Sequence, residues 1–285
     1  MSEQPKPVFD VSLPEVRDVV RRALEEDIGF GDITSQFTIG EDSLASGRFY
    51  ARQKLVLAGI ELLPVIYEMC GGVQSIELLA RSGDECADGQ PIAGVHGNAR
   101  RLLQCERVAL NFMQRLSGVA TLGRRFVEAV AGTGAKILDT RKTTPGLRRL
   151  EKMAAAAGGV TNHRYGLWDA ILIKNNHITA AGGVAEALRR AAEAGLPVEI
   201  EVRAKAELEE ALQHGATHLL LDNLTPPEAA EWIRLVAGRA QTEISGGITL
   251  DNVRAYAEAG PDFISSGAIT HSATAVDLNF RLRFD

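Results

Sequence analysis

Apolar residues follow two different patterns along the chain. Between about residues 47 and 95, short apolar pieces alternate with Gly-Gly, Gly-Asp and Asp-Gly turns, which predicts a small unit made mostly of strands. Helical spacing on either side predicts two helices. The first begins at a capping box, Ser12–Glu15, and ends near Gly29; the second spans Asn98–Ser117 and is expected to end at a C-cap, Gly118.

Beyond Gly118 the pattern changes to a repeat of strand, loop and helix. Alanine-rich helical stretches separate the apolar strands, which is typical of parallel strands joined by crossover helices. There is room for most of an α/β barrel, with six clear strands rather than eight. The predicted strands cover residues 136–138, 170–173, 198–202, 218–221, 242–244 and 262–264.

Polar side chains follow the ends of these strands. In a parallel α/β barrel the carboxyl ends of the strands share one mouth, where active sites lie, so we expect these groups to converge. Glu199 and Glu201 alternate within one strand and therefore point to the same face. The polar groups at strand ends are Asp139–Lys142, Lys174–His177, Asp222–Asn223, Ser245–Gly247 and Ser265–Gly267.

Composition narrows the function classes. Apolar residues make up 45% of the 285 residues and charged residues 24%, as in a globular protein. The net charge of −6 argues against a general nucleic-acid or membrane-surface binder. No apolar run approaches a membrane span and the N-terminus lacks the apolar stretch of a signal peptide, so a cytoplasmic protein is expected. The three cysteines lack metal-ligand spacing and are expected to be packing residues: Cys70, Cys86 and Cys105.

Positive charge gathers between Asp139 and His177, where seven cations accompany three acids. Arginine binds carboxylates or phosphates with two hydrogen bonds and lysine adds a movable charge, so this segment suits a polyanionic ligand. The cations at strand ends or in a Gly-rich loop are expected to serve it: Arg141, Lys142, Arg164 and Lys174. The others are expected on a solvated helix face: Arg148, Arg149 and Lys152.

Three further groups could complete such a site. The Gly-rich turns after the last two strands, Ser245–Gly247 and Ser266–Gly267, suit a phosphate bound by backbone N–H groups. Glu201 and Asp222 end successive strands and suit a hydrated Mg²⁺, although salt bridges to the neighbouring cations explain them as well. His163 suits hydrogen bonding to an anion, proton transfer or a structural role.

Several blocks of the sequence resemble the quinolinate phosphoribosyltransferase family, also called nicotinate-nucleotide pyrophosphorylases (carboxylating). The resemblance runs nearly from end to end, and blocks in family order are far more specific than one glycine motif. The blocks are Glu26–Ser35 (EDIGFGDITS), Glu106–Asn111 (ERVALN), Gln114–Thr121 (QRLSGVAT), Asp139–Arg148 (DTRKTTPGLR), Asn162–Arg164 (NHR), Leu172–Lys174 (LIK), Leu221–Asn223 (LDN), Ser245–Ile248 (SGGI) and Thr270–Ser272 (THS).

The resemblance implies an enzyme of NAD biosynthesis. The family joins quinolinate to phosphoribosyl pyrophosphate and releases nicotinate mononucleotide, pyrophosphate and CO₂, with Mg²⁺. The implied fold is an N-terminal α/β sandwich over residues 1–117, completed by the C-terminal tail 270–285, and an incomplete α/β barrel over residues 118–269 that holds the active site. The implied assembly is a homodimer in which Arg107 enters the neighbouring subunit's site.

The resemblance also assigns roles. The catalytic residues would be Lys142, Glu201 and Asp222, of which Glu201 and Asp222 would serve the ribose and Mg²⁺, partly through water. The residues on the side of the dicarboxylate and pyrophosphate would be Arg107, Arg141, Lys142, His163, Arg164 and Lys174, and those on the side of the 5′-phosphate would be Ser245, Gly246, Gly247, Ser266, Gly267 and His271.

Three residues depart from the family pattern. Val160 stands where a third glycine is usual, Asn175 where an acidic residue is usual, and Ser266 where a small apolar residue is common. Val160 leaves the backbone geometry of its loop in question. Two alternatives stay open: a related transferase that uses nicotinate or another base, and a non-catalytic barrel that binds a phosphosugar.

Overall fold

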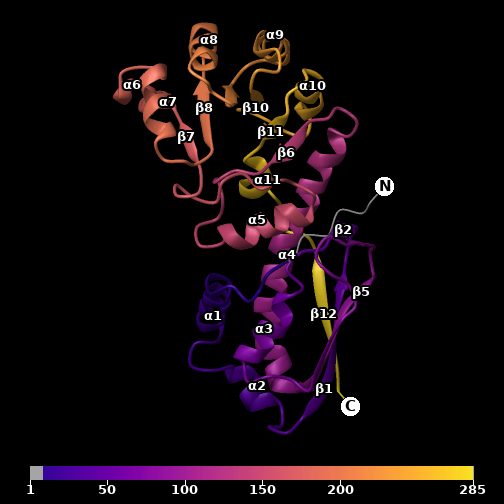
Figure 1. Ribbon diagram of the computed structural model, residues 1–285. Coiled ribbons are helices and arrows are strands. Elements are labelled where there is room, and N and C mark those ends of the chain that lie inside the picture. The colour runs from indigo at the N-terminus through magenta and orange to yellow at the C-terminus, as the bar shows by residue number, and fades with distance from the viewer. Residues whose placement is uncertain (1–8, 285) are drawn as a thin grey trace. The chain divides into compact units, whose positions relative to one another are not determined.

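Residues 9–284 are described by the computed structural model, and they divide into two units (Figure 1). Residues 1–8 and residue 285 lie outside the described residues. Most of the N-terminal segment on which the prediction about a signal peptide rests therefore lies outside them too. Unit 1 consists of Met1–Arg124, Thr144–Gly159 and Ser272–Asp285, and unit 2 of Arg125–Thr143 and Val160–His271. Unit 1 thus includes residues 144–159, which we expected within the barrel.

A four-stranded antiparallel sheet with the order β12-β1-β5-β3 forms the body of unit 1. One face is buried and apolar, with Phe49 and Ile92 fully buried, and the other face is exposed. The elements are β1 (Leu44–Ala51), β3 (Ser75–Leu78), β5 (Pro91–Asn98) and β12 (Leu278–Phe284), the pair β2 (Leu55–Val56) and β4 (Glu85–Cys86), and the helices α1 (Pro14–Ile28), α2 (Ile33–Thr38) and α3 (Leu62–Met69).

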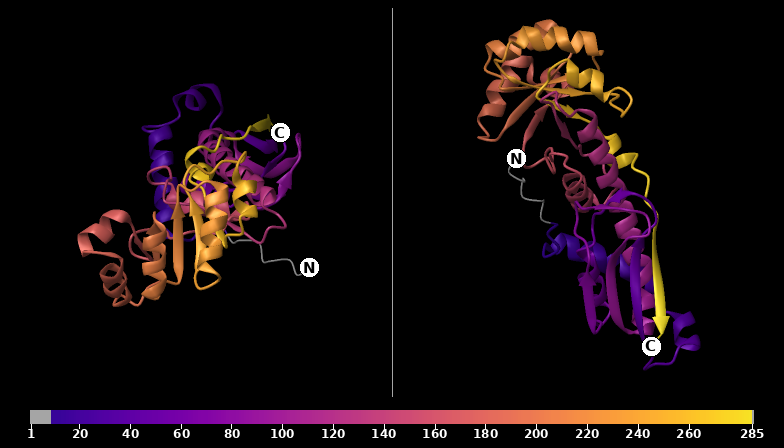
Figure 2. Two further views of the ribbon diagram at one scale, coloured as in Figure 1. Left: turned by 90° about the horizontal axis from the view of Figure 1, so that it is seen from above. Right: turned by 90° about the vertical axis from the view of Figure 1, so that its right-hand side faces the viewer.

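The C-terminal strand completes this sheet. β12 runs antiparallel to β1 along the whole strand, and Figure 2 shows it in yellow beside the strands from the N-terminal part of the chain. Phe280 packs on Phe49 with the ring centroids 4.6 Å apart. A contact between two residues so distant in sequence ties the end of the chain to its first strand.

The helix expected to end at Gly118 continues to Ala129. α4 (Ala99–Ala129) passes through Gly118, so the prediction of a C-cap there is wrong. The glycine permits close packing instead, because a Cβ atom at this position would press on the backbone carbonyl of Thr274. Both roles require a missing side chain, so the sequence alone does not separate them.

The capping box expected at Ser12–Glu15 is also wrong. The N-cap of α1 is Leu13, and no side chain caps the helix. The Ser12 hydroxyl donates instead to Asp10 Oδ1 at 2.7 Å. A local turn therefore competes successfully with the helix end for this hydroxyl.

The charges of α5 (Arg148–Ala157) are more buried than expected. Lys152 is fully buried, so its assignment to a solvated face is wrong; most of this short helix is covered. Glu151 is fully buried too, and its Oε1 accepts hydrogen bonds from Thr144 Oγ1 and Arg115 Nη2, both at 2.7 Å. These bonds satisfy the buried carboxylate and fasten residues 144–159 to unit 1.

Unit 2 is built on six parallel strands in the order β6-β11-β10-β9-β8-β7. Each agrees with a strand predicted from the sequence to within one residue at either end, and the prediction of an incomplete barrel with crossover helices is confirmed. The strands are β6 (Lys136–Leu138), β7 (Ile171–Ile173), β8 (Val198–Val202), β9 (His218–Asp222), β10 (Gln241–Ser245) and β11 (Phe263–Ser265).

Helices cover the outer face of this sheet. Ile200, Leu219 and Leu221 are fully buried in one cluster with residues of the helices, among them Leu208 and Trp232. The helices are α6 (Asn175–Ala181), α7 (Val184–Ala192), α8 (Lys205–Gln213), α9 (Pro226–Val236), α10 (Val253–Glu258) and α11 (Ala268–His271). No helix within residues 9–284 combines the length and apolarity needed to cross a bilayer.

We expect Gly118→Ala to lower the free energy of unfolding by about 2 kcal/mol, because the new methyl group meets backbone that cannot move aside. Urea unfolding measures the change. The matched control is Gly94→Ala, whose Cβ would approach nothing closer than Glu77 Oε2 at 3.8 Å. Equal stability of the two variants would contradict the packing role of Gly118.

Candidate active site

The inner face of the unit 2 sheet is polar. Glu201 and Glu243 are both in register with Leu220 on the strand between them, so their side chains lie on one face. Glu199, two residues before Glu201, points to the same side. Carboxylates therefore occupy the face that the helices leave uncovered.

Most of the predicted site residues lie at or beyond the carboxyl ends of the six strands. These ends form one edge, because neighbouring strands are parallel. The predicted residues that close or follow a strand there are Arg141, Lys142, Lys174, Asp222, Ser245, Gly246, Gly247, Ser266 and Gly267, and Glu201 lies one residue before the end of β8.

Arg141 and Arg164 lie close enough for their charges to interact. Burial lowers the pKa of Arg164, and the positive charge of Arg141 lowers it further, while Glu199 and Asp169 act in the opposite direction. Arg164 Nη1 also donates to the carbonyl of Ala170 at 3.1 Å. Two guanidinium groups held together repel each other, and an anion bound beside them would relieve that repulsion.

A buried aspartate fixes the loop that carries Arg164. Asp139 is fully buried and accepts hydrogen bonds from Asn162 Nδ2 at 2.6 Å and from the backbone N–H of His163 at 2.8 Å. The same aspartate follows β6 and precedes Arg141 by two residues. One residue thus links the segments that carry both arginines.

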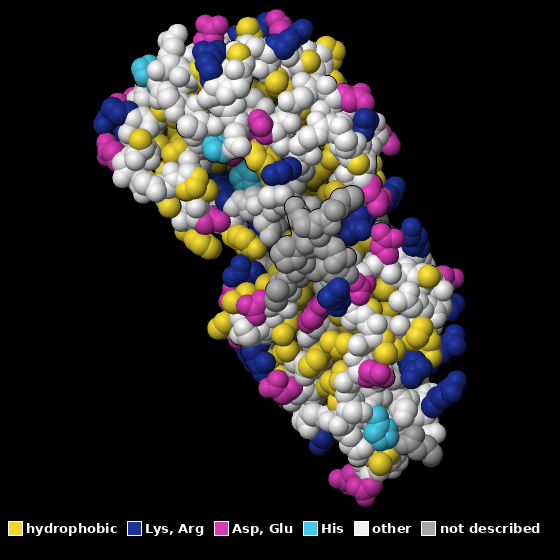
Figure 3. Space-filling model, turned by 45° about the vertical axis from the view of Figure 1, so that its right-hand side comes forward, with side chains coloured by type: hydrophobic (Ala, Val, Ile, Leu, Met, Phe, Trp, Pro, Cys, Tyr) yellow, Lys and Arg dark blue, Asp and Glu magenta, His cyan; other side chains and the backbone are white. Residues whose placement is uncertain are grey.

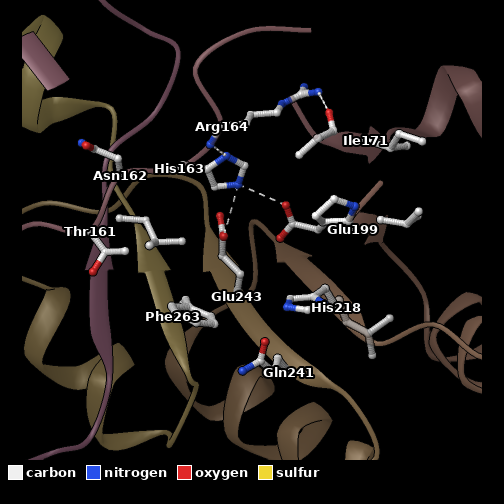
Figure 4. Close-up of a pocket in the computed structure, with 15 residues that line it drawn as sticks. Thr161, Asn162, His163, Arg164, Ile171, Glu199, His218, Gln241, Glu243 and Phe263 are labelled. Atoms are coloured by element: carbon white, nitrogen blue, oxygen red, sulfur yellow. Dashed lines mark hydrogen bonds and ion pairs between the residues drawn. The ribbon is translucent and has the colours of Figure 1, made fainter. Parts of the chain in front are cut away.

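His163 is held by two glutamates on the inner face (Figure 4). Its Nε2 lies 3.1 Å from Glu199 Oε2 and 3.5 Å from Glu243 Oε2, and its Nδ1 accepts a hydrogen bond from the N–H of Arg164 at 2.8 Å. The three side chains line a cavity of about 300 Å³ that reaches His218 and Phe263. Both ring nitrogens of His163 thus have protein partners.

The proton distribution of this cluster follows from the bond to Nδ1. Burial lowers the pKa of His163, but the hydrogen bonds to Glu199 and Glu243 outweigh it and raise the value to about 10. Burial also raises the pKa of Glu243. Because Nδ1 accepts from Arg164, we attribute both raised pKa values to one proton that His163 Nε2 and Glu243 share, rather than to a second proton on Nδ1.

This arrangement argues against a metal ion in the cluster. The ligand atoms of His163, Glu199 and Glu243 lie within 4.8 Å of one another, as metal ligands do. However, an imidazole that binds a metal through Nε2 donates from Nδ1 to its surroundings, and here Nδ1 accepts. We assign the cluster to positioning the His163–Arg164 turn.

Glu201 has a hydrogen-bond partner that was not predicted from the sequence. Its Oε1 accepts from Arg203 Nη2 at 2.6 Å and from Arg203 Nε at 2.9 Å, while Glu201 itself is buried. Arg203 directly follows β8, so the same strand-end signal that identified the other cations could have found it. Both bonds use one carboxylate oxygen, which leaves the second oxygen for a ribose hydroxyl or a hydrated cation.

Asp222 sits beside a strained turn. Asn223 has φ 57°, a left-handed conformation that few side chains adopt, and its Nδ2 donates to Asp222 Oδ2 at 2.7 Å. A Cβ atom on Gly246, which has φ 100°, would collide with Asn223 Oδ1. The glycine therefore allows the turns after β9 and β10 to touch, and strain of this kind often accompanies function.

Lys142, Gly267 and His271 come together at the end of β11. A Cβ atom on Gly267 would lie 2.7 Å from Lys142 Cδ and 2.9 Å from His271 Cδ2. The hydroxyl of Thr270 donates to the backbone carbonyl of Lys142 at 2.8 Å, which holds the two segments side by side. The result is a bare backbone flanked by a lysine and a histidine.

Within residues 9–284, three of the predicted site residues make no side-chain hydrogen bond or ion pair with the clusters described above. Ser266 is buried, and its hydroxyl donates to the carbonyl of Ile248 at 2.8 Å, so its side chain serves the backbone. Lys174 is exposed at the end of β7, where His177 Nδ1 accepts from its backbone N–H. Arg107 is exposed on α4, in unit 1.

Both units match models of one family. Residues 32–117 match the N-terminal domain of quinolinate phosphoribosyl transferase, and residues 119–281 match its C-terminal domain. A nicotinate-nucleotide pyrophosphorylase (carboxylating) from Mycobacterium leprae is 41% identical over 281 residues, 96% of this chain and 99% of the relative. The crystal structure of NadC from Streptococcus pyogenes aligns with a TM-score of 0.93 at 34% identity, over 98% of this chain and 100% of the other.

This chain belongs to the quinolinate phosphoribosyltransferase family. A probable nicotinate-nucleotide pyrophosphorylase (carboxylating) from Bacillus subtilis, 40% identical over 93% of this chain and 92% of its own length, agrees. The protein is accordingly a pentosyltransferase of NAD biosynthesis that joins quinolinate and phosphoribosyl pyrophosphate with loss of CO₂. Human nicotinic acid phosphoribosyltransferase, at 12% identity and a TM-score of 0.63, shares the fold alone.

The departures from the quinolinate phosphoribosyltransferase pattern are accommodated locally. Val160 is buried and has an ordinary φ, because only Asn223 and Ala237 have positive φ among the described residues other than glycine. A β-branched residue therefore fits where glycine is usual. Asn175 is the first residue of α6, outside the contacts described above.

We expect the stability of wild-type protein to fall, relative to Glu243→Gln, as pH rises above about 4.5. The pKa of Glu243 is raised above its ordinary value of 4.5, so the folded state keeps a proton that the unfolded state loses, and stability declines as pH rises through that window. Urea unfolding across pH 4 to 8 measures both proteins.

The matched control is Glu199→Gln, which removes the charged acceptor of the His163 Nε2 proton. It should cost about 2 kcal/mol at neutral pH, more than Glu243→Gln, since glutamine resembles the protonated Glu243 side chain. If Glu243→Gln destabilises the protein more than Glu199→Gln does, Glu199 rather than Glu243 shares the proton with His163, and our assignment is wrong.

Proposed function

We propose that this quinolinate phosphoribosyltransferase binds its substrates along the carboxyl edge of the unit 2 sheet, with the quinolinate carboxylates at Arg141 and Arg164. The observation that supports this most is that Asp139, two residues before Arg141, binds Asn162 and the backbone N–H of His163 and so links the segments that carry the two arginines. Quinolinate carries two adjacent carboxylates, and each arginine can donate two parallel hydrogen bonds to one of them. Lys174 adds positive charge at the end of β7.

Phosphate groups would occupy the glycine turns at the end of the sheet. Gly267 presents backbone between Lys142 and His271, and Gly246 and Gly247 follow Ser245 in the next turn. Glycine lets an anion approach the backbone N–H groups closely, and lysine neutralises its charge. We therefore assign the 5′-phosphate to these turns.

Glu201 and Asp222 suit the ribose and a magnesium ion. Their oxygen atoms are hard donors, and Mg²⁺ commonly keeps several waters and binds through one or two carboxylates. The ion would neutralise charge on the leaving pyrophosphate. Glu201 and Asp222 themselves stabilise the positive charge that develops on the ribose when the bond from C1 to the pyrophosphate oxygen breaks.

The remaining steps need little from the protein beyond positioning. The pyridine nitrogen of quinolinate attacks C1 of the ribose and becomes a positively charged pyridinium. That charge stabilises the electron pair left on C2 when the adjacent carboxylate departs as CO₂, and C2 then takes up a proton. Lys142 and a bound water are the two donors that fit.

A homodimer with Arg107 in the neighbouring subunit's site is part of the proposal. Arg107 is exposed on α4. Each unit also exposes large apolar side chains: Phe30 and Phe37 in unit 1, and Leu167 and Trp168, at 74% and 75% exposure, in unit 2. Exposed apolar groups of this size are typical of surfaces that bind another protein. The cytoplasmic location stays a prediction.

Release of CO₂ from carboxyl-labelled quinolinate, in the presence of phosphoribosyl pyrophosphate and Mg²⁺, tests the function. We expect CO₂, pyrophosphate and nicotinate mononucleotide in equal amounts. Turnover of nicotinate with none of quinolinate would select the related transferase instead. Binding of phosphoribosyl pyrophosphate without turnover of any pyridine acid would select the non-catalytic barrel.

We expect Arg141→Lys to lower kcat/KM for quinolinate about 100-fold, equivalent to about 2.7 kcal/mol, because lysine keeps the charge but loses the paired hydrogen bonds. Steady-state kinetics measure this, and KM for phosphoribosyl pyrophosphate should stay within about twofold. The control is Arg125→Lys at an exposed position of α4, which should leave both constants unchanged. Unaltered quinolinate kinetics in Arg141→Lys would remove Arg141 from the site.

Chelation of divalent cations should abolish turnover, and Asp222→Asn should raise the Mg²⁺ concentration for half-maximal rate by about tenfold, because one anionic oxygen ligand is lost. Magnesium titrations of the initial rate measure this. Asp251→Asn removes an exposed carboxylate elsewhere in unit 2 and should leave the titration curve in place. An identical shift in both variants would point to bulk electrostatics rather than to a ligand.

A further inference from the structure

The exposed face of the unit 1 sheet carries an ordered set of polar side chains. The pairing of strands β12, β1, β5 and β3 places Arg281, Arg48, Gly94 and Glu77 in one row across the sheet. A second row, two residues further along each strand, consists of Arg283, Ser46, His96 and Ser75. All of these residues lie on the face opposite the buried core.

Three arginines on this face lack acidic partners. Among the described residues none of Arg48, Arg281 and Arg283 makes an ion pair, although several other arginines of unit 1, such as Arg17 and Arg124, do. Arg48 and Arg281 are direct cross-strand partners, and like charges in that position destabilise a sheet. An unpaired, repelling set of cations is unexpected in a chain with a net charge of −6.

Protection of a sheet edge explains only part of this pattern. Arginine on the edge strand β12 discourages pairing with another chain, which accounts for Arg281 and Arg283. It does not account for Arg48, since β1 lies between β12 and β5. The cross-strand repulsion is therefore retained on an interior strand.

The surface is also hollowed. A groove of about 390 Å³ runs over the sheet, and Gly94 leaves its centre without a side chain between Arg48 and Glu77. Arg281 lies over the ring of Tyr50, 5.4 Å from its centroid, which holds the guanidinium over the sheet. Ser46 and His96 hydrogen-bond to each other at 3.1 Å on the floor of the groove. On the face in Figure 3, Lys and Arg side chains are frequent along the lower part of the molecule, which is unit 1.

We infer that this groove is a second ligand site, which binds a pyrophosphate group, either free or as part of a nucleotide. The arginines occupy both rows, about 5 Å apart across the strands and about 7 Å along them, so they suit an anion with more than one charged centre. Guanidinium groups donate to phosphate oxygens in pairs, and the anion removes the repulsion between Arg48 and Arg281. The site is distinct from the proposed active site, because none of its residues is among those assigned there, and all of them belong to unit 1.

Isothermal titration calorimetry of the full chain with inorganic pyrophosphate, and separately with ADP, tests the inference. We expect two pyrophosphate sites per chain in the wild-type protein, one in the barrel and one in the groove. The double variant Arg48→Gln/Arg281→Gln should weaken the second site by at least about tenfold and leave the first, with transferase activity retained. ADP bound at the second site identifies a nucleotide source, and pyrophosphate alone identifies the free anion.

Two further variants sharpen the result. Glu77→Gln removes the one acid in the two rows and should tighten pyrophosphate binding at the second site. Arg125→Gln removes a positive charge outside the groove, as a control for the arginine variants, and should not change that binding. If the double variant does not fold, Arg283→Gln near the end of β12 provides the same test. If no pyrophosphate site of the wild-type chain is weakened by these arginine variants, the inference is overturned, whether or not the barrel binds pyrophosphate.

Discussion

The active edge depends on a buried aspartate that ties together two segments carrying positive charge. Arg141 lies in the irregular segment after β6, and Arg164 lies in the irregular segment before β7. The fully buried Asp139 binds the backbone of His163 and the side chain of Asn162, and the partly buried Glu199 binds the ring of His163. These hydrogen bonds hold the segments of Arg141 and Arg164 in place before an anionic ligand binds and neutralises the two positive charges.

The two faces of the barrel sheet have different roles in supporting the site. The outer face is apolar and packs under the helices, which gives the strands a fixed register. The inner face carries Glu199, Glu201 and Glu243, which could not be buried among apolar side chains without partners. His163 and Arg203 provide those partners, so the acids anchor the segments that carry the site.

The sequence was most informative where one periodicity repeats and least informative where contacts join distant segments. All six barrel strands were found because apolar runs and strand-end polar groups are local signals. The close approach of Gly118 to Thr274, the burial of Lys152 and the pairing of β12 with β1 depend on residues far away along the chain. Arg203 and Glu243 could have been predicted from the sequence, because Arg203 is a cation directly after a strand and Glu243 is an acid inside one. Neither was predicted, since Arg203 lies outside the segment between Asp139 and His177 in which the cations were counted, and Glu243 lies before the end of its strand.

A crystal structure of the protein with bound quinolinate tests directly whether Arg141 and Arg164 bind the two carboxylates. We expect each carboxylate of the ligand to lie within hydrogen-bond distance of a guanidinium group, one from Arg141 and the other from Arg164. A quinolinate molecule bound away from both arginines, with the two side chains unchanged in position, would contradict it.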